Sequence, residues 1–169
     1  MSNYSNRKKD QFIKSIPKIS LDSKNCNILA RCKFNFSYFD NSQEAGQDFK
    51  DWTQEELCKL LNKLKEYGRK SLDEWENSYI GSGRHKNSIF VNYGDFPRKS
   101  DFVFPKHVPH QAKWGRFRLE QAVRLVGFTI PDCYHDQSNN NGNSKFKFDR
   151  NTFYIVFLDS NHQFYKVAK

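Results

Sequence analysis

Two apolar segments in the last third of the sequence carry side chains that could act on a phosphate. Arg116, Arg118 and Arg124 fall in the first, strand-like segment, and His162 and Tyr165 follow the second. Arginine stays charged and can hold a phosphate through two parallel hydrogen bonds. Histidine titrates near neutrality and can move a proton at a ribose or leaving oxygen, while tyrosine can stack on a base. The candidate catalytic residues are therefore Arg118, Arg124, His162 and Tyr165.

A simpler interpretation of the same residues stays open. Outward arginines on a strand commonly serve only solubility, and His162 could do no more than cap the turn that begins at Asp159. The choice depends on whether the strands bring the arginines and the histidine to one surface.

Further basic residues would extend a nucleic-acid surface. The glycine-rich segment 81–87 could cradle a phosphate with its backbone amides, but it lacks the Gly-Lys-Ser/Thr ending of a nucleotide-binding loop. An NTPase is therefore not expected. The candidate nucleic-acid-binding residues are Lys113, Arg116, Arg84, Lys86 and Lys166.

Composition and charge favour an anionic partner. The chain has 28 Lys+Arg against 19 Asp+Glu, which gives a formal net charge of +9 at pH 7. Such an excess favours nucleic acid or an acidic protein. No apolar stretch is long enough to span a bilayer and the N-terminal residues do not form a signal peptide, so we expect a cytoplasmic protein without membrane attachment.

A metal site is a weak alternative. His107 and His110 form one short-spaced pair, and Cys133 and His135 form another, which together could close a tetrahedral zinc site. The pairs do not match a known zinc signature, so we expect neither a metal nor another cofactor. The chain also lacks the Gly-x-Ser-x-Gly pattern of a serine hydrolase.

Sequence periodicity predicts the elements that must position these residues. Residues 28–38 alternate apolar and polar, which predicts a half-buried strand. Thr53 and Glu56 form a capping box that opens a helix over 53–67, with Gly68 suited to a left-handed C-terminal cap. A second capping box at 71–74 opens a shorter helix, whose inner face would be Leu72, Trp75 and Tyr79.

The last third predicts most of the sheet. Residues 117–130 form a strand-like segment with an interruption at 120–122, which we interpret as a bulge. A polar hairpin tip follows, and the continuously apolar run 152–158 returns as a strand covered on both faces. Residues 164–165 could add a short edge strand.

These elements define one fold class and one domain. The order predicts an α+β fold with a mainly antiparallel sheet and two helices packed on one face. We expect a flexible basic tail over 1–15 and a single domain over 16–169, with a long loop at 81–112 and a mobile loop at 132–150.

The closing pattern of the chain resembles the RelE/ParE-type toxin superfamily. Arg118 and Arg124, the apolar stretch 153–158, and His162 followed by Tyr165 are similar to its arginine-bearing strand, return strand and final titratable residues. The resemblance implies a small basic protein that cuts messenger RNA, often on the ribosome, and that pairs with an acidic antitoxin. It implies that Arg118 or Arg124 stabilises charge on the scissile phosphate, and that His162 or Tyr165 assists the 2′-hydroxyl.

The chain departs from that pattern by its length, by its enlarged loop at 132–150 and by the lack of a clearly placed general-base glutamate, for which Glu120 is the nearest candidate. The leading hypothesis is an RNA-interacting protein, specifically a metal-independent, toxin-type endoribonuclease. The alternative is a non-catalytic basic module that binds nucleic acid or an acidic protein.

Overall fold

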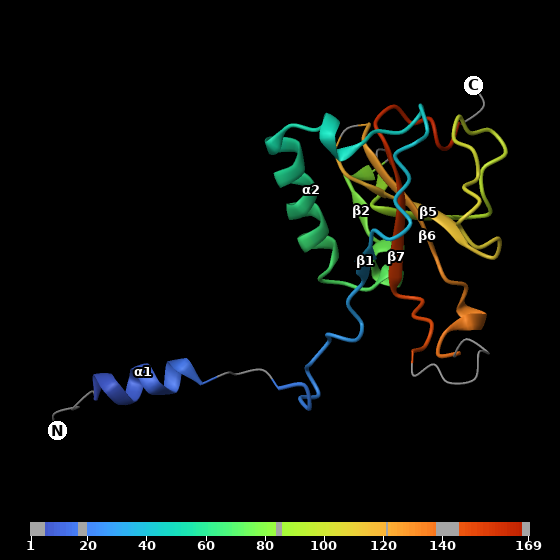
Figure 1. Cartoon of the computed structure of the whole chain (residues 1–169). Helices are drawn as coiled ribbons and strands as arrows, with labels where there is room; N and C mark the ends of the chain where they lie inside the picture. Colours follow the sequence, from blue (N-terminus) through green and yellow to red (C-terminus); the bar gives the residue numbers. More distant parts are fainter. Residues whose placement is uncertain (1–5, 17–19, 84–85, 121, 138–145, 167–169) are drawn as a thin grey trace.

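A five-stranded mixed sheet forms the centre of the protein (Figure 1). The computed structural model describes residues 6–16, 20–83, 86–120, 122–137 and 146–166. Its strands are β1 (Lys33–Asn35), β4 (Phe90–Gly94), β5 (Lys113–Arg118), β6 (Arg124–Thr129) and β7 (Thr152–Asp159), in the order β1-β7-β6-β5-β4. All neighbours are antiparallel except β1 and β7, which run parallel. The predicted α+β class is confirmed.

Strand β7 lies in the interior of the sheet because nearly all of its side chains are apolar. Phe153, Ile155 and Leu158 pack into one core, and Val156 and Phe157 pack into the core on the other face. A register shift against β6 places two successive residues of β7 on the same side. The predicted return strand is confirmed, and both of its faces are covered.

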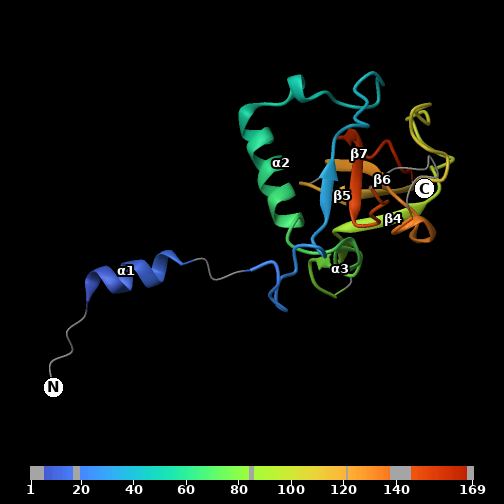
Figure 2. The same ribbon diagram turned by 60° about the horizontal axis from the view of Figure 1, so that its bottom comes forward.

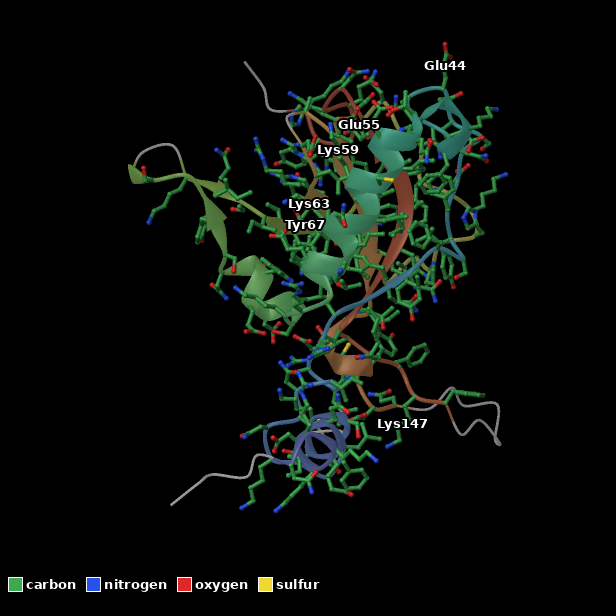
Figure 3. The ribbon with its side chains drawn as sticks, turned by 90° about the vertical axis from the view of Figure 1, so that its left-hand side faces the viewer. Glu44, Glu55, Lys59, Lys63, Tyr67 and Lys147 are labelled. Atoms are coloured by element: carbon green, nitrogen blue, oxygen red, sulfur yellow. The ribbon has the colours of Figure 1, made fainter. Side chains whose placement is uncertain are left out.

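Two helices cover one face of the sheet. Helix α2 (Gln54–Tyr67) lies along the sheet (Figure 1), and α3 (Leu72–Glu76) follows it at the end near β4 (Figure 2). Figure 3 looks onto α2 from outside, with Tyr67 at its C-terminal end. The Tyr67 ring stacks on Phe117, and its hydroxyl donates a hydrogen bond to the carbonyl oxygen of Arg118. The helix therefore fixes the backbone of β5 at its arginine-bearing end.

Both capping boxes form as the sequence predicts. The Thr53 hydroxyl accepts from the amide of Glu56, and the Glu56 carboxylate accepts from the amide of Thr53. Gly68 ends α2 at a φ of −65°, so the expected left-handed cap is wrong. Its amide instead donates to the Leu64 carbonyl, continuing the helical turn. Tyr79 does not join the inner face of α3, because it lies in an exposed hairpin.

We predict that Thr53→Ala lowers the free energy of unfolding by about 1 kcal/mol, because the amide of Glu56 loses its acceptor. Urea denaturation monitored by circular dichroism measures the change. Gln54→Ala, at the exposed first position of α2, is the matched control and should change the free energy by less than about 0.5 kcal/mol. Equal effects of the two substitutions would contradict a specific role of the cap.

The predicted long strand over 28–38 is wrong except at its centre. Only β1 pairs, with the N-terminal end of β7. The Asn35 side chain accepts a hydrogen bond from the amide of Ser37, and the Phe39 amide donates to Phe36, so local turns end the strand. Upstream, Leu29 is 86% exposed. Alternation alone did not reveal that the flanking residues lack a neighbouring strand.

The predicted interruption at 120–122, of which residue 121 lies outside the described residues, falls between two antiparallel strands and not within one bulged strand. The Val123 amide donates to the Glu120 carbonyl, and the Leu119 amide donates to the Val123 carbonyl. This connection separates β5 from β6 and pairs Arg118 with Arg124 across the strands. The expected loop at 81–112 contains β4 and β3 (Asn87–Ser88), which pairs with β2 (Tyr79–Ile80).

The first helix, α1 (Arg7–Ser15), lies apart from the sheet in two views (Figure 1, Figure 2). None of its residues is buried. Over the described part of the chain, no helix combines the length and apolarity needed to cross a membrane.

Candidate nucleic-acid interface

The alternation of β5 directs two arginines to the sheet face opposite α2. Trp114 belongs to the core on that face, whereas Phe117 packs on the α2 side. Because side chains alternate along a strand, Arg116 and Arg118 share the face of Trp114. Arg124 lies opposite Arg118 on β6, so it shares this face too. We call the surface formed by Arg116, Arg118, Arg124, His162 and Tyr165 the arginine face.

A turn after β7 brings His162 to the arginine face. Asp159 is 1% exposed, and its carboxylate accepts hydrogen bonds from the amides of Asn161, Gln163 and Phe164. His162 adopts a φ of 57°, in the left-handed region that non-glycine residues seldom occupy. Asp159 thus stabilises an uncommon turn that presents the imidazole.

Arg124 lies beneath the surface and contacts His162 directly. It is 4% exposed. One of its Nη atoms donates to the Val123 carbonyl at 2.8 Å, and the other lies 3.1 Å from Nε2 of His162. Arginine has no acceptor, so the imidazole must accept through Nε2 and carry its proton on Nδ1. The geometry therefore fixes one tautomer of His162.

The charges around this pair oppose a second positive charge. Loss of hydration, followed by the charges of Arg116 and Arg118, lowers the pKa of Arg124 to about 10. Desolvation first and then the charge of Arg124 lower the pKa of His162 below its ordinary value, against the opposing effect of Asp159. Arg124 stays a cation at neutral pH, and His162 is held neutral.

Tyr93 lies beneath the arginine face and contacts both Arg116 and Tyr165. Nε of Arg116 donates to the Tyr93 hydroxyl at 3.2 Å, and one of its Nη atoms donates to the Ser88 carbonyl at 3.4 Å. The rings of Tyr93 and Tyr165 stack with centroids 4.5 Å apart and an interplanar angle of 2°. Tyr165 is 47% exposed, so this stack offers part of an aromatic surface to solvent.

A small hollow of about 20 Å³ opens among these residues, which is room for about one oxygen atom. Asp159 is the one carboxylate among its lining residues, and it is held by backbone amides. No ion pair joins Arg116 or Arg118 to a carboxylate within the described residues. The residues that line the hollow are Tyr93, Arg116, Arg124, Val126, Asp159, His162, Phe164 and Tyr165.

The other predicted basic residues lie elsewhere or are engaged. Lys113 alternates to the α2 side of the sheet and lies 3.6 Å from Asp95. Lys166 forms an ion pair with Asp101, and Lys86 is exposed beyond β2. Arg84 lies outside the described residues. Among the described members of the predicted nucleic-acid-binding set, Arg116 is thus the one that lies in the arginine face.

The residues proposed for zinc do not assemble. Nε2 of His107 lies 3.2 Å from the Tyr38 carbonyl, whereas Nδ1 of His135 accepts from the Arg150 amide. Among the residues that the structure describes, no group of three or more His, Cys, Asp or Glu side chains could hold a metal ion. The combination of His107, His110, Cys133 and His135 as a zinc site is therefore wrong.

Sequence reasoning missed Tyr93, Asp159 as a buried anchor, and the burial of Arg124. Tyr93 lies in a part of the chain with little periodicity, so no local pattern connected it with Tyr165. Glu120, the nearest candidate for a general base, lies 3.9 Å from Lys59 of α2 and lines a cavity on the helix side. It is therefore not part of the arginine face.

Comparison with known proteins gives no relative. No family model matches the chain, and no curated protein or solved structure is significantly similar to it. The functional assignment therefore rests on the geometry of the arginine face.

Proposed function

We propose that the protein binds RNA through the arginine face. The observation that carries this proposal is that Arg116, Arg118, Arg124 and His162 share one sheet face. The guanidinium groups of Arg116 and Arg118, which form no ion pair with a carboxylate among the described residues, suit phosphate oxygens, which they can contact through paired hydrogen bonds. The net charge of +9 would attract a polyanion to the same molecule. An RNA partner fits a cytoplasmic location.

The aromatic stack favours unpaired RNA as the ligand. A base can stack on Tyr165 only when it has left its own helical stack, and single strands expose such bases. The Tyr93 ring stacks on the Tyr165 ring, and the Tyr93 hydroxyl accepts a hydrogen bond from Arg116. A base stacked on Tyr165 would therefore place its phosphate near a guanidinium group. This arrangement supports a single strand over a duplex.

Metal-independent RNA cleavage is a second candidate, favoured by the contact between Arg124 and His162. In such a reaction the 2′-oxygen attacks phosphorus, the bond to the 5′-oxygen breaks, and a 2′,3′-cyclic phosphate and a 5′-hydroxyl form. The 2′-hydroxyl loses a proton to a base and the leaving oxygen gains one from an acid. Arginines would stabilise the charge that develops on the phosphate. The RelE/ParE-type resemblance belongs to this second proposal, as does an acidic antitoxin as a partner.

We predict that Arg116→Ala and Arg118→Ala each weaken binding of a single-stranded RNA by about tenfold at low salt, because each removes a phosphate contact. The salt dependence of binding should also fall by about one unit of slope per residue. Fluorescence anisotropy over a series of salt concentrations measures both quantities.

Lys113→Ala is the matched control for these two variants. It removes the same charge from the same strand, but on the opposite face of the sheet. A loss of affinity as large for Lys113→Ala as for Arg116→Ala would show that only net charge matters, and would remove the arginine face as the binding site.

Cleavage is tested separately with His162→Ala. If the protein is a toxin-type endoribonuclease, its expression should arrest bacterial growth, and this substitution should relieve the arrest while weakening RNA binding at about pH 8 less than Arg116→Ala does. RNA that is bound but never cut would leave the binding function alone. If the protein binds an acidic protein through this face but does not bind RNA, both proposals are wrong and the alternative of a protein-binding module holds.

A further inference from the structure

The contact between Arg124 and His162 can exist only while the histidine is neutral. A guanidinium donates hydrogen bonds and accepts none, and an imidazolium does the same. The 3.1 Å contact therefore requires the lone pair of Nε2. If His162 gains a proton there, two cations and two donors face each other, and the contact must break or take in an acceptor. An anionic oxygen placed between them would accept from both.

The hollow beside this pair provides the place for such an oxygen. Its volume of about 20 Å³ is too small for a whole phosphate but large enough for one of its oxygen atoms. Arg116, Arg124 and His162 all line it. The remaining phosphate oxygens would stay at the surface, where Arg118 is accessible.

The groups that face His162 come from every neighbouring strand. Positive charge comes from Arg124 on β6 and from Arg116 and Arg118 on β5, while the Asp159 carboxylate on β7 opposes it. Tyr93 on β4 and Tyr165 after the turn also line the hollow. In the free protein the balance disfavours the imidazolium. One added negative charge at contact distance from His162 reverses that balance.

We propose that the hollow receives a non-bridging oxygen of an RNA phosphodiester, and that its binding is coupled to the uptake of one proton by His162. This inference rests on the proposed RNA-binding function and adds to it the protonation state of the bound complex. It assigns His162 the role of a proton donor: the imidazolium formed on binding is suited to protonate the leaving 5′-oxygen. In the free protein its lone pair is occupied by Arg124, which makes it a poor base.

The coupling makes RNA binding dependent on pH in a defined direction. His162 is neutral in the free protein at neutral pH, since its pKa is lowered there. A bound phosphodiester raises that pKa, so the complex holds one more proton than the free protein over the interval between the two values. By linkage, affinity must increase as the pH falls through that interval, about tenfold for each unit by which the pKa rises.

Nitrogen NMR of the histidine side chains tests the proposal. The free protein should show His162 as the Nδ1–H tautomer. We expect a saturating 2′-O-methyl dinucleotide, which cannot be cleaved, to raise the pKa of His162 by about one unit or more and to shift both ring nitrogens toward the imidazolium position. Sulfate, whose charge is constant between about pH 5 and 8, should act in the same direction. His107 and His110, which do not line the hollow, are internal controls, and their ring-nitrogen signals should not change when the dinucleotide is added.

A matched variant supplies a second readout. His162→Gln removes the titrating group, so dinucleotide affinity should become independent of pH between about pH 5 and 8 and should match the weaker affinity that the wild type shows at the upper end of that range. If the dinucleotide binds the wild type and His162 stays neutral, the coupling is wrong and the RNA-binding function survives. If neither the dinucleotide nor longer single-stranded RNA binds, the proposed function fails, and the coupling fails with it.

Discussion

Replacing Asp159 by alanine is expected to lower the free energy of unfolding by about 3–5 kcal/mol. The carboxylate is 1% exposed, and three backbone amides, of Asn161, Gln163 and Phe164, would lose their acceptor. The substitution also removes a negative charge that faces the buried Arg124 across β6 and β7. Urea denaturation measures the loss.

Two further variants sharpen this prediction. Asp159→Asn keeps one acceptor oxygen without the charge, so its loss of stability should lie between those of wild type and Asp159→Ala. Asp95→Ala removes an aspartate whose side chain is 97% exposed and should stay within about 0.5 kcal/mol of wild type. If Asp159→Ala is as harmless as Asp95→Ala, then the carboxylate does not hold the turn that presents His162.

Gly127→Ala should destabilise the fold by about 3 kcal/mol or more, because the strand has no room for a side chain there. A Cβ at this position would lie 2.1 Å from the Tyr154 carbonyl oxygen and 2.9 Å from the Phe153 ring. Both neighbours belong to β7, and Phe153 is fully buried, so neither can move away cheaply. The melting temperature of a chain of this size should fall by about 6 °C or more.

Gly68→Ala is the control for Gly127→Ala. Gly68 has an ordinary negative φ, and its Cβ would approach the Leu64 carbonyl oxygen at 3.2 Å. We expect its stability to stay within about 1 kcal/mol of wild type. A Gly127→Ala protein that melts with the wild type would contradict the close approach of β6 and β7 at this point.

The parts of the fold that could be predicted are those with short-range causes. The capping box of Thr53 and Glu56 acts within one helical turn, and the apolar run of β7 reports its own burial on both faces. The strand predicted over 28–38 is too long because a strand extends only as far as its pairing partner. The partner of β1 lies more than 100 residues away along the chain. Alternation cannot show where that pairing stops.

The candidate site likewise has features that the sequence predicts and features that it does not. Side-chain alternation along β5 made Arg116 and Arg118 candidates for one surface, and the register with β6 adds Arg124. The burial of Arg124 was not predictable, since the residues that line the hollow with it come from the turn after β7 and from β4. Lys113 is close to Arg116 in the sequence, but the two residues are three positions apart along β5 and therefore lie on opposite faces of the sheet.

The most direct test of RNA binding through the arginine face is a titration of the ¹⁵N-labelled protein with a short single-stranded RNA. We expect the largest changes in amide chemical shift at the C-terminal end of β5, at the N-terminal end of β6 and in the turn after Asp159. These changes should be lost in Arg116→Ala. Amides of α2, on the opposite side of the sheet, should stay unchanged. Shifts confined to α2, or no shifts with RNA at low salt, would contradict the account.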